Sequence, residues 1–112
     1  MDSKQIHVTA NCPIRTTLEL IGGKWKLLIL FQLRTAPVRP SQLRRLIPDI
    51  SEKMLIQELR LLMDSGLVVR KDFGMIPPKV EYQLTEKGRG ALPLIEEMRR
   101  FAEHYQERRR TR

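Results

Sequence analysis

The sequence predicts a mainly α-helical domain with a small β-hairpin. Three observations predict it: apolar residues recur at helical spacing over most of the chain, two short strand-like segments lie between residues 67 and 84, and no apolar run is long enough to cross a bilayer. A chain of 112 residues suits one domain. We therefore expect a single domain over residues 1–112, with a folded core at about 12–107 and flexible ends at 1–11 and 108–112.

The first half of the chain is predicted to form four helices. Pro13 can open the first, because its missing N–H costs nothing in a first turn, and Gly22-Gly23 ends it. The second, at about 24–34, is apolar nearly all round, which predicts a buried central helix, with Trp25 read as core rather than as part of a ligand pocket. After a short third helix at about 41–47, Ser51 is predicted to cap a fourth that ends at Ser65-Gly66. The core stripe of this fourth helix is Leu55, Leu59, Leu62 and Met63.

The second half is predicted to form a hairpin and one long helix. Residues 67–73 and 80–84 have strand character, and the loop between them contains Pro77-Pro78. Thr85 is expected to cap a last helix that runs to about residue 107 and is kinked by Pro93. Two short helices joined by a tight turn and followed by a two-stranded hairpin are the layout of a winged helix-turn-helix.

The charge of the chain favours an anionic partner. The net charge is +8, and no acidic residue interrupts the stretch from residue 20 to residue 48. The basic residues of that stretch are Lys24, Lys26, Arg34, Arg39, Arg44 and Arg45. Such a balance is typical of proteins that bind nucleic acid and, less often, membrane surfaces.

Catalysis, metal binding and export are not expected. Cys12 is the only cysteine, so no internal disulfide is available, and a lone thiol fits a reducing cytoplasm. His7 and His104 are far apart in the sequence, and neither has a partner at metal-ligand spacing. The acidic residues do not pair at catalytic spacing, and the N-terminus lacks an apolar signal core. We expect a cytoplasmic protein that is not an enzyme, with no cofactor and no membrane partner.

The fourth predicted helix carries a set of residues suited to reading DNA. Lys53, Gln57 and Arg60 share one face at i, i+4 and i+7. Gln pairs with adenine, while Lys and Arg pair with guanine or phosphate. On the same face, Ile56 and Glu58 count against DNA contact, and a solvated helix face is the alternative interpretation. The full set of candidate DNA-binding residues is Arg39, Ser41, Arg44, Arg45, Ser51, Lys53, Met54, Ile56, Gln57, Arg60 and Lys79.

The first and last predicted helices carry more apolar surface than one small domain can bury. This excess predicts a homodimer held by those two helices, with its two recognition helices about 34 Å apart, one turn of DNA. The predicted interface residues are Ile14, Leu18, Ile21, Ile95, Met98, Phe101 and Tyr105.

Several segments, in their order and spacing, resemble the HxlR family of bacterial transcriptional regulators from Cys12 to about His104. They are Cys12-Pro13, residues 20–25, Leu43-Arg44-Arg45, residues 50–55, Gly66-Leu67-Val68, residues 77–82 and residues 84–89. The resemblance implies a dimer built from the first and last helices, a fourth helix in the major groove and a wing on the flanking backbone. The sequence departs from the family pattern at Pro40, where an aromatic residue is usual, and at Ile56 and Glu58, where Thr or Ser and a basic residue are common. The last two departures bear on the operator sequence.

The resemblance also implies that some family members sense reactive small molecules through a cysteine near the N-terminus. Cys12 directly precedes the first predicted helix, whose free N–H groups and dipole can stabilise a thiolate. We hypothesise a sensing thiol here; the alternative is a small buried apolar residue. The leading interpretation is a sequence-specific regulator that binds double-stranded DNA as a homodimer on a pseudo-palindromic operator, modulated by a small-molecule inducer or redox signal. The alternatives are a winged-helix protein-interaction module and a basic protein that binds nucleic acid without sequence preference.

Overall fold

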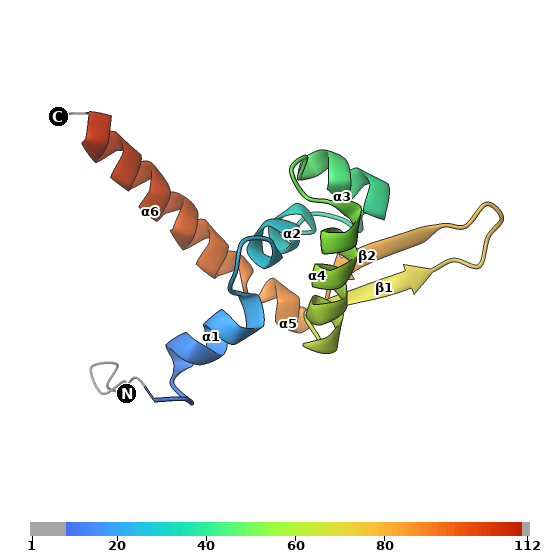
Figure 1. The fold of residues 1–112 in the computed structure, drawn as a ribbon, viewed down its shortest axis with the longest axis horizontal. Helices are drawn as coiled ribbons and strands as arrows, with labels where there is room; N and C mark the ends of the chain where they lie inside the picture. Colours follow the sequence, from blue (N-terminus) through green and yellow to red (C-terminus); the bar gives the residue numbers. More distant parts are fainter. Residues whose placement is uncertain (1–8, 111–112) are drawn as a thin grey trace.

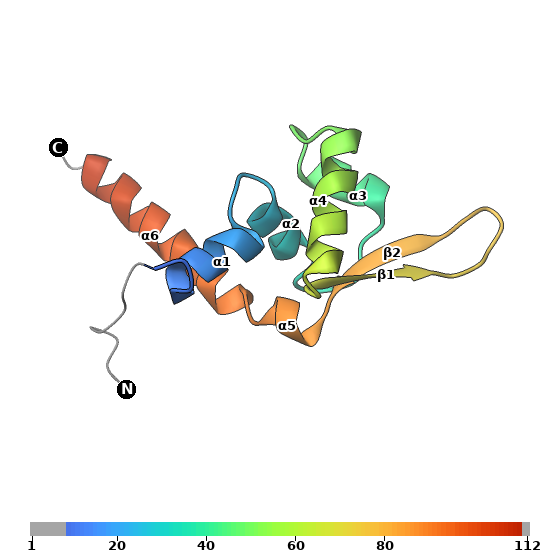
Figure 2. The same cartoon turned by 60° about the horizontal axis from the view of Figure 1, so that its bottom comes forward.

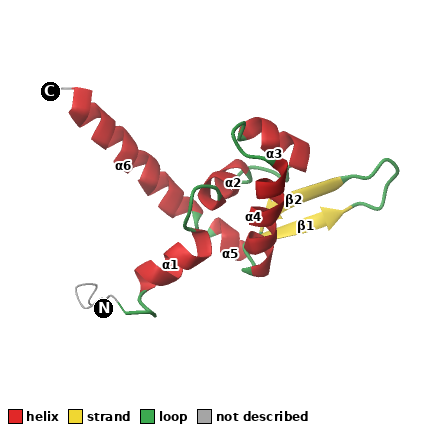
Figure 3. Ribbon diagram, in the orientation of Figure 1, coloured by secondary structure: helices red, strands yellow, loops and turns green. Residues whose placement is uncertain are grey.

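The computed structural model describes residues 9–110, with side chains described for residues 9–107. Of the ends expected to be flexible, residues 1–8 and 111–112 lie outside the described range. The elements follow in the order α1 (Pro13–Ile21), α2 (Lys26–Gln32), α3 (Pro40–Leu46), α4 (Glu52–Asp64), β1 (Val68–Asp72), β2 (Val80–Leu84), α5 (Glu86–Arg89) and α6 (Leu92–Arg110). The predicted mainly helical architecture with one hairpin is confirmed (Figures 1 and 3).

The core lies where α2, α3 and α4 meet the base of the hairpin. Helix α2 contacts α3, α4 and α6. The most deeply buried large side chains are Ile29, Leu30 and Leu33 with Leu43 of α3 and Leu55, Leu59 and Leu62 of α4. Burial of one such side chain contributes roughly 1.5–3 kcal/mol, so this cluster stabilises the packing of α4 on α2. Helices α1 and α6 project on the side of the body opposite the hairpin (Figures 1 and 2).

Helix α4 has well-formed ends. At its start, the Met54 N–H donates to Ser51 Oγ at 3.1 Å, which satisfies one of the free N–H groups of the first turn. At its end, Gly66 has φ +76°, a conformation that glycine adopts without strain. The cap and stop predicted from the sequence are therefore confirmed, and they define the length of the exposed face of α4.

The hairpin forms a wing beside α4. Strands β1 and β2 are antiparallel, with Val68 opposite Leu84 and Asp72 opposite Val80. Val38, in the extended segment before α3, joins the base of the wing through two backbone hydrogen bonds with Tyr82, each 2.9 Å. Pro40 does not weaken this contact, because it is the first residue of α3, where a missing N–H is tolerated.

The expectation of a single long last helix is wrong. The structure divides it into α5 and α6, with the break at Gly90 and Ala91. Pro93 lies in the first turn of α6, where proline is tolerated, so the helix restarts at the proline instead of kinking there. Helix α6 also extends past the predicted end, to Arg110. Over residues 9–110, no helix is both long enough and apolar enough to span a bilayer.

Helix α2 is shorter and less buried than expected. It spans Lys26–Gln32 where the sequence predicted about 24–34. Leu28 is 43% exposed, and Leu27 and Trp25 are only partly buried. The apolar character of α2 therefore exceeds what the fold of this chain buries.

Gly88 fixes α5 against the base of the wing. A Cβ at this position would lie 2.1 Å from the backbone oxygen of Leu67. We expect Gly88→Ala to lower the free energy of unfolding by about 1–3 kcal/mol, because backbone must move to make room. Urea unfolding measures this change, with Gly90→Ala as control, since a Cβ there approaches only Lys87 O, at 3.1 Å. A Gly88→Ala protein as stable as wild type would contradict this packing.

Candidate nucleic-acid interface

The outward face of α4 carries the predicted reading residues together. Lys53, Ile56, Gln57 and Arg60 are all exposed and, with Glu52, line a shallow hollow of about 530 Å³. Ion pairs among the described side chains involve neither Lys53 nor Arg60. This face therefore offers amide and cationic groups to an external partner.

A second groove, of about 400 Å³, joins α3 and α4 to the wing. Ser41 and Arg44 of α3 line it with Ile56 of α4 and Arg70 of β1. Arg70 was missed by the sequence analysis because β1 shows no alternation that would single it out: Val68 is buried and the four residues after it are all exposed. Its guanidinium lies 3.9 Å from the Asp72 carboxylate. The groove places two arginines beside the outward face of α4.

Three arginines predicted to grip phosphates are unpaired. Arg39, Arg44 and Arg45 are exposed, and within residues 9–107 no carboxylate lies within ion-pair distance of any of them. This agrees with the absence of acidic residues in the surrounding sequence. Unpaired surface arginines are suited to bidentate contacts with phosphate.

Lys79 shares an aromatic ring with a second lysine near the tip of the wing. Its Nζ lies 4.4 Å from the centroid of the Phe73 ring, and the Nζ of Lys71 lies 5.1 Å from the same centroid. Attraction between ammonium groups and a ring face is worth about 0.5–1 kcal/mol at exposed sites. The ring therefore holds two cations at this end of the wing. Lys71 was not among the predicted residues.

Of the residues singled out at or beside α4, only Glu58 is placed differently from the sequence interpretation. Ser51 uses its hydroxyl as the helix cap, and Met54 is partly buried against the core. Both help to position the helix. Glu58, which we counted on the outward face, is buried instead, with 8% of its surface exposed. Its Oε1 lies 2.9 Å from Lys26 Nζ, so α2 supplies the counter-charge that keeps this carboxylate inside.

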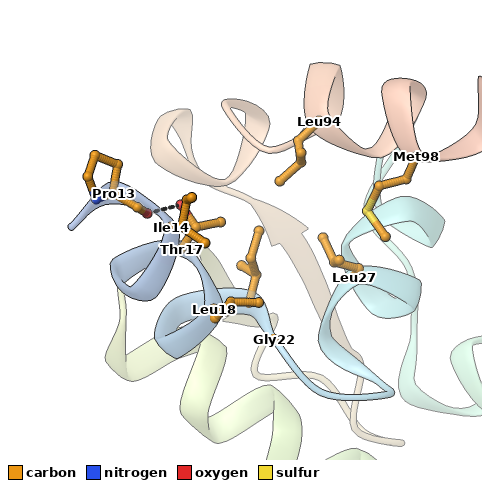
Figure 4. Close-up of a pocket in the computed structure, with 9 residues that line it drawn as sticks. Pro13, Ile14, Thr17, Leu18, Gly22, Leu27, Leu94 and Met98 are labelled. Atoms are coloured by element: carbon orange, nitrogen blue, oxygen red, sulfur yellow. Dashed lines mark hydrogen bonds between the residues drawn. The ribbon is translucent and has the colours of Figure 1, made fainter. Parts of the chain in front are cut away.

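An apolar groove of about 420 Å³ lies between α1, α2 and α6. Leu18 of α1, Leu27 of α2, and Leu94 and Met98 of α6 point toward one another across it (Figure 4). Leu18 is 62% exposed, and Ile14 and Met98 are also exposed. Thr17, the hydroxyl-bearing residue of the lining, donates its O–H to Pro13 O at 2.8 Å, so its polar group is already satisfied.

The predicted dimer residues divide between this exposed face and the core. Farther along α6, Phe101 is 74% exposed and stacks on Tyr105, with ring centroids 6.4 Å apart. Ile21 is buried in the core but also lines the groove, and Ile95 is partly buried against the core, so these two contribute less exposed surface than the other predicted interface residues.

Another side of α6 is charged. Arg99 is hydrogen bonded to Glu96 and to Glu103, the latter at 2.6 Å, and Arg100 donates to Glu97 at 2.7 Å. The hydrogen bond from Arg99 lowers the pKa of the Glu96 carboxyl. Helix α6 is thus amphipathic well beyond the body of the domain.

Cys12 is the N-cap residue of α1 and is buried, with 4% of its surface exposed. Its Sγ accepts a hydrogen bond from the backbone N–H of Arg15 at 3.3 Å. The next residue, Pro13, lines the apolar groove. The thiol therefore lies where α1 begins, between a helix N-terminus and the exposed apolar face.

Known proteins resemble this chain in sequence. The sequence model of the HxlR-like helix-turn-helix family matches residues 20–110. YkvN, an uncharacterized HTH-type transcriptional regulator of Bacillus subtilis, is 48% identical over 97 residues, which cover 87% of this chain and 82% of YkvN.

Solved structures of regulators also resemble this chain in fold. A crystal structure from Porphyromonas gingivalis, assigned to the MarR family of transcriptional regulators, matches with a TM-score of 0.83 and 44% identity, covering 86% of this chain and 94% of that one. The redox regulator HypR in its oxidized form matches with a TM-score of 0.79 and 40% identity, covering 83% and 96%.

Proposed function

We propose that this chain, which belongs to the HxlR-like helix-turn-helix family of transcriptional regulators, binds a specific duplex DNA site as a homodimer. The single observation that supports this most strongly is the outward face of α4. Gln57 and Arg60 lie exposed on it, and Arg60 has no ion-pair partner among the described side chains. The adjoining groove is lined by Arg44 of α3 and Arg70 of the wing. A helix of 13 residues is about 20 Å long, a length that fits into the major groove.

The proposal gives each group a role. Gln57 would pair with an adenine edge, and Lys53 and Arg60 with guanine edges or phosphates. Arg39, Arg44 and Arg45 would hold the phosphates that flank the groove. The wing would contact the neighbouring backbone through the lysines on Phe73. Phosphate contacts fix the register, whereas the α4 contacts carry the sequence information.

Selection from a random pool of duplex DNA tests the proposal. Repeated binding and amplification should enrich a two-fold symmetric motif, and fluorescence anisotropy should then show at least 100-fold tighter binding to that motif than to a scrambled duplex of equal length. A pool that remains random after selection would refute sequence-specific binding. Equal affinity for both duplexes would instead favour a basic protein that binds nucleic acid without preference.

The dimer is proposed to form through α1 and α6. Leu18 and Phe101 are largely exposed, and an apolar surface of this extent favours association. We expect light scattering at micromolar concentration to give twice the chain mass of 13.2 kDa. Leu18→Glu should yield monomers, because it places a charge in the groove. Ile76→Glu is the matched control, since Ile76 is 98% exposed in the wing loop. A monomeric wild-type protein would contradict the proposal.

Cys12 is proposed to make DNA binding responsive to thiol chemistry. The relative HypR is a redox regulator. Because Cys12 is buried, modification requires the start of α1 to move, and α1 is part of the proposed dimer face. We expect treatment with diamide or a quinone to change duplex affinity at least tenfold in wild type and not in Cys12→Ser. A fully modified protein with unchanged affinity would leave Cys12 as a packing residue.

A further inference from the structure

The ion pair between Lys26 and Glu58 lies inside the DNA-binding unit. Lys26 Nζ and Glu58 Oε1 are 2.9 Å apart, and their side chains are only 16% and 11% exposed. Among residues 9–107, Glu58 is the one charged residue that is buried. The pair connects the first residue of α2 to the middle of α4.

Stability does not account for such a pair. Removing two charges from water costs several kcal/mol, and apolar replacements of similar volume are often neutral or stabilising. Both helices also contribute apolar side chains to the buried core, such as Ile29, Leu30 and Leu59, and the hydrophobic effect that buries them has no preferred direction. The hydrogen-bonded ion pair is the directional contact between the two helices.

A directional contact at this place controls how α4 is rotated about its own axis. Glu58 follows Gln57 and precedes Arg60 by two residues. The ion pair therefore acts on the same turn of helix that carries the side chains of Gln57 and Arg60. A rotation of about 20° moves side-chain tips at a radius of about 6 Å by about 2 Å. A displacement of that size breaks hydrogen bonds to base edges but leaves long-range attraction to phosphates.

We propose that Lys26 and Glu58 are positioning residues for DNA recognition, whose ion pair fixes the rotation of α4 on α2 so that Gln57 and Arg60 meet their bases. The inference rests on the proposed function. Because α2 also contacts α6, the pair orients the reading face relative to the proposed dimer interface as well.

The test compares charge-neutral double variants on the duplex selected by wild type and on its scrambled counterpart. Lys26→Met/Glu58→Leu replaces the pair by apolar groups, and Lys26→Glu/Glu58→Lys reverses it. The matched control is Lys24→Met/Asp49→Leu, which removes the exposed ion pair whose atoms are 3.7 Å apart and whose side chains are 67% and 65% exposed. All three keep the net charge of the protein, so attraction to phosphate is unchanged.

We expect the Met/Leu variant to fold, with a urea midpoint at or above that of wild type. It should bind the scrambled duplex within twofold of wild type and the selected duplex at least tenfold more weakly. The reversed pair should recover most of this loss, and the control should behave like wild type.

A folded Met/Leu variant that discriminates between the duplexes as wild type does would overturn the proposal, because the pair would then be structural only. A folded reversed pair that recovers nothing would overturn it too. If the proposed sequence-specific DNA binding is itself wrong, the result is different: the wild-type protein will not distinguish the two duplexes.

Discussion

Raising the salt concentration from ~50 to ~200 mM is expected to weaken duplex binding by about 10⁴-fold. Each phosphate that a protein neutralises releases condensed counterions, so affinity falls steeply with salt. Four cations per protomer carry this expectation: Arg39, Arg44, Arg45 and Lys79. None of them forms an ion pair with a described carboxylate, so binding DNA breaks no existing salt bridge. In a dimer they would contact about eight phosphates.

Titrations by fluorescence anisotropy at several salt concentrations measure the slope of log affinity against log salt. Arg44→Ala, present in both protomers, should reduce the slope by about 2. It should also weaken binding to selected and scrambled duplexes alike, because a phosphate contact carries no direct sequence information. An affinity that stays flat across this range would contradict the electrostatic part of the account.

Loss of the Gln57 or the Arg60 side chain is expected to reduce discrimination between the selected and the scrambled duplex by about 1–3 kcal/mol each. Both side chains are exposed on the outward face of α4, so truncation removes no core packing. Gln57→Ala also leaves the charge of the protein unchanged, and its affinity for scrambled DNA should therefore match that of wild type.

Arg44→Ala is the reference variant, because the loss of a phosphate contact should weaken binding to both duplexes alike. Binding of both variants to both duplexes is measured at one fixed salt concentration. Equal losses on the two duplexes for Gln57→Ala would show that another face of the protein reads the DNA.

The sequence predicted the elements that local signals specify. Ser51, Gly66 and the apolar stripe of Leu55, Leu59 and Leu62 define α4 within one or two residues. The alternation of residues 80–84 predicted β2 with its observed bounds. The outward face of α4 followed directly, because helical spacing decides which side chains oppose a buried stripe.

Features that depend on contacts between distant segments were not predictable in this way. Helical spacing alone placed Glu58 near the outward face, and its burial depends on Lys26, 32 positions earlier in the chain. Ile21 and Ile95 belong to apolar stripes that continue from the exposed face into the core, and only packing decides where each stripe enters the body. Lys71 belongs to the site because its ammonium group lies over the ring of Phe73 in the wing.

We propose that two α4 helices occupy successive major grooves on one side of a DNA duplex. Protection of guanine N7 atoms from methylation, mapped base by base on the selected duplex, tests it most directly, because this atom is exposed in the major groove. We expect two protected patches with centres about 34 Å apart, one helical turn. A single patch, or weak protection spread evenly along the duplex, would contradict it.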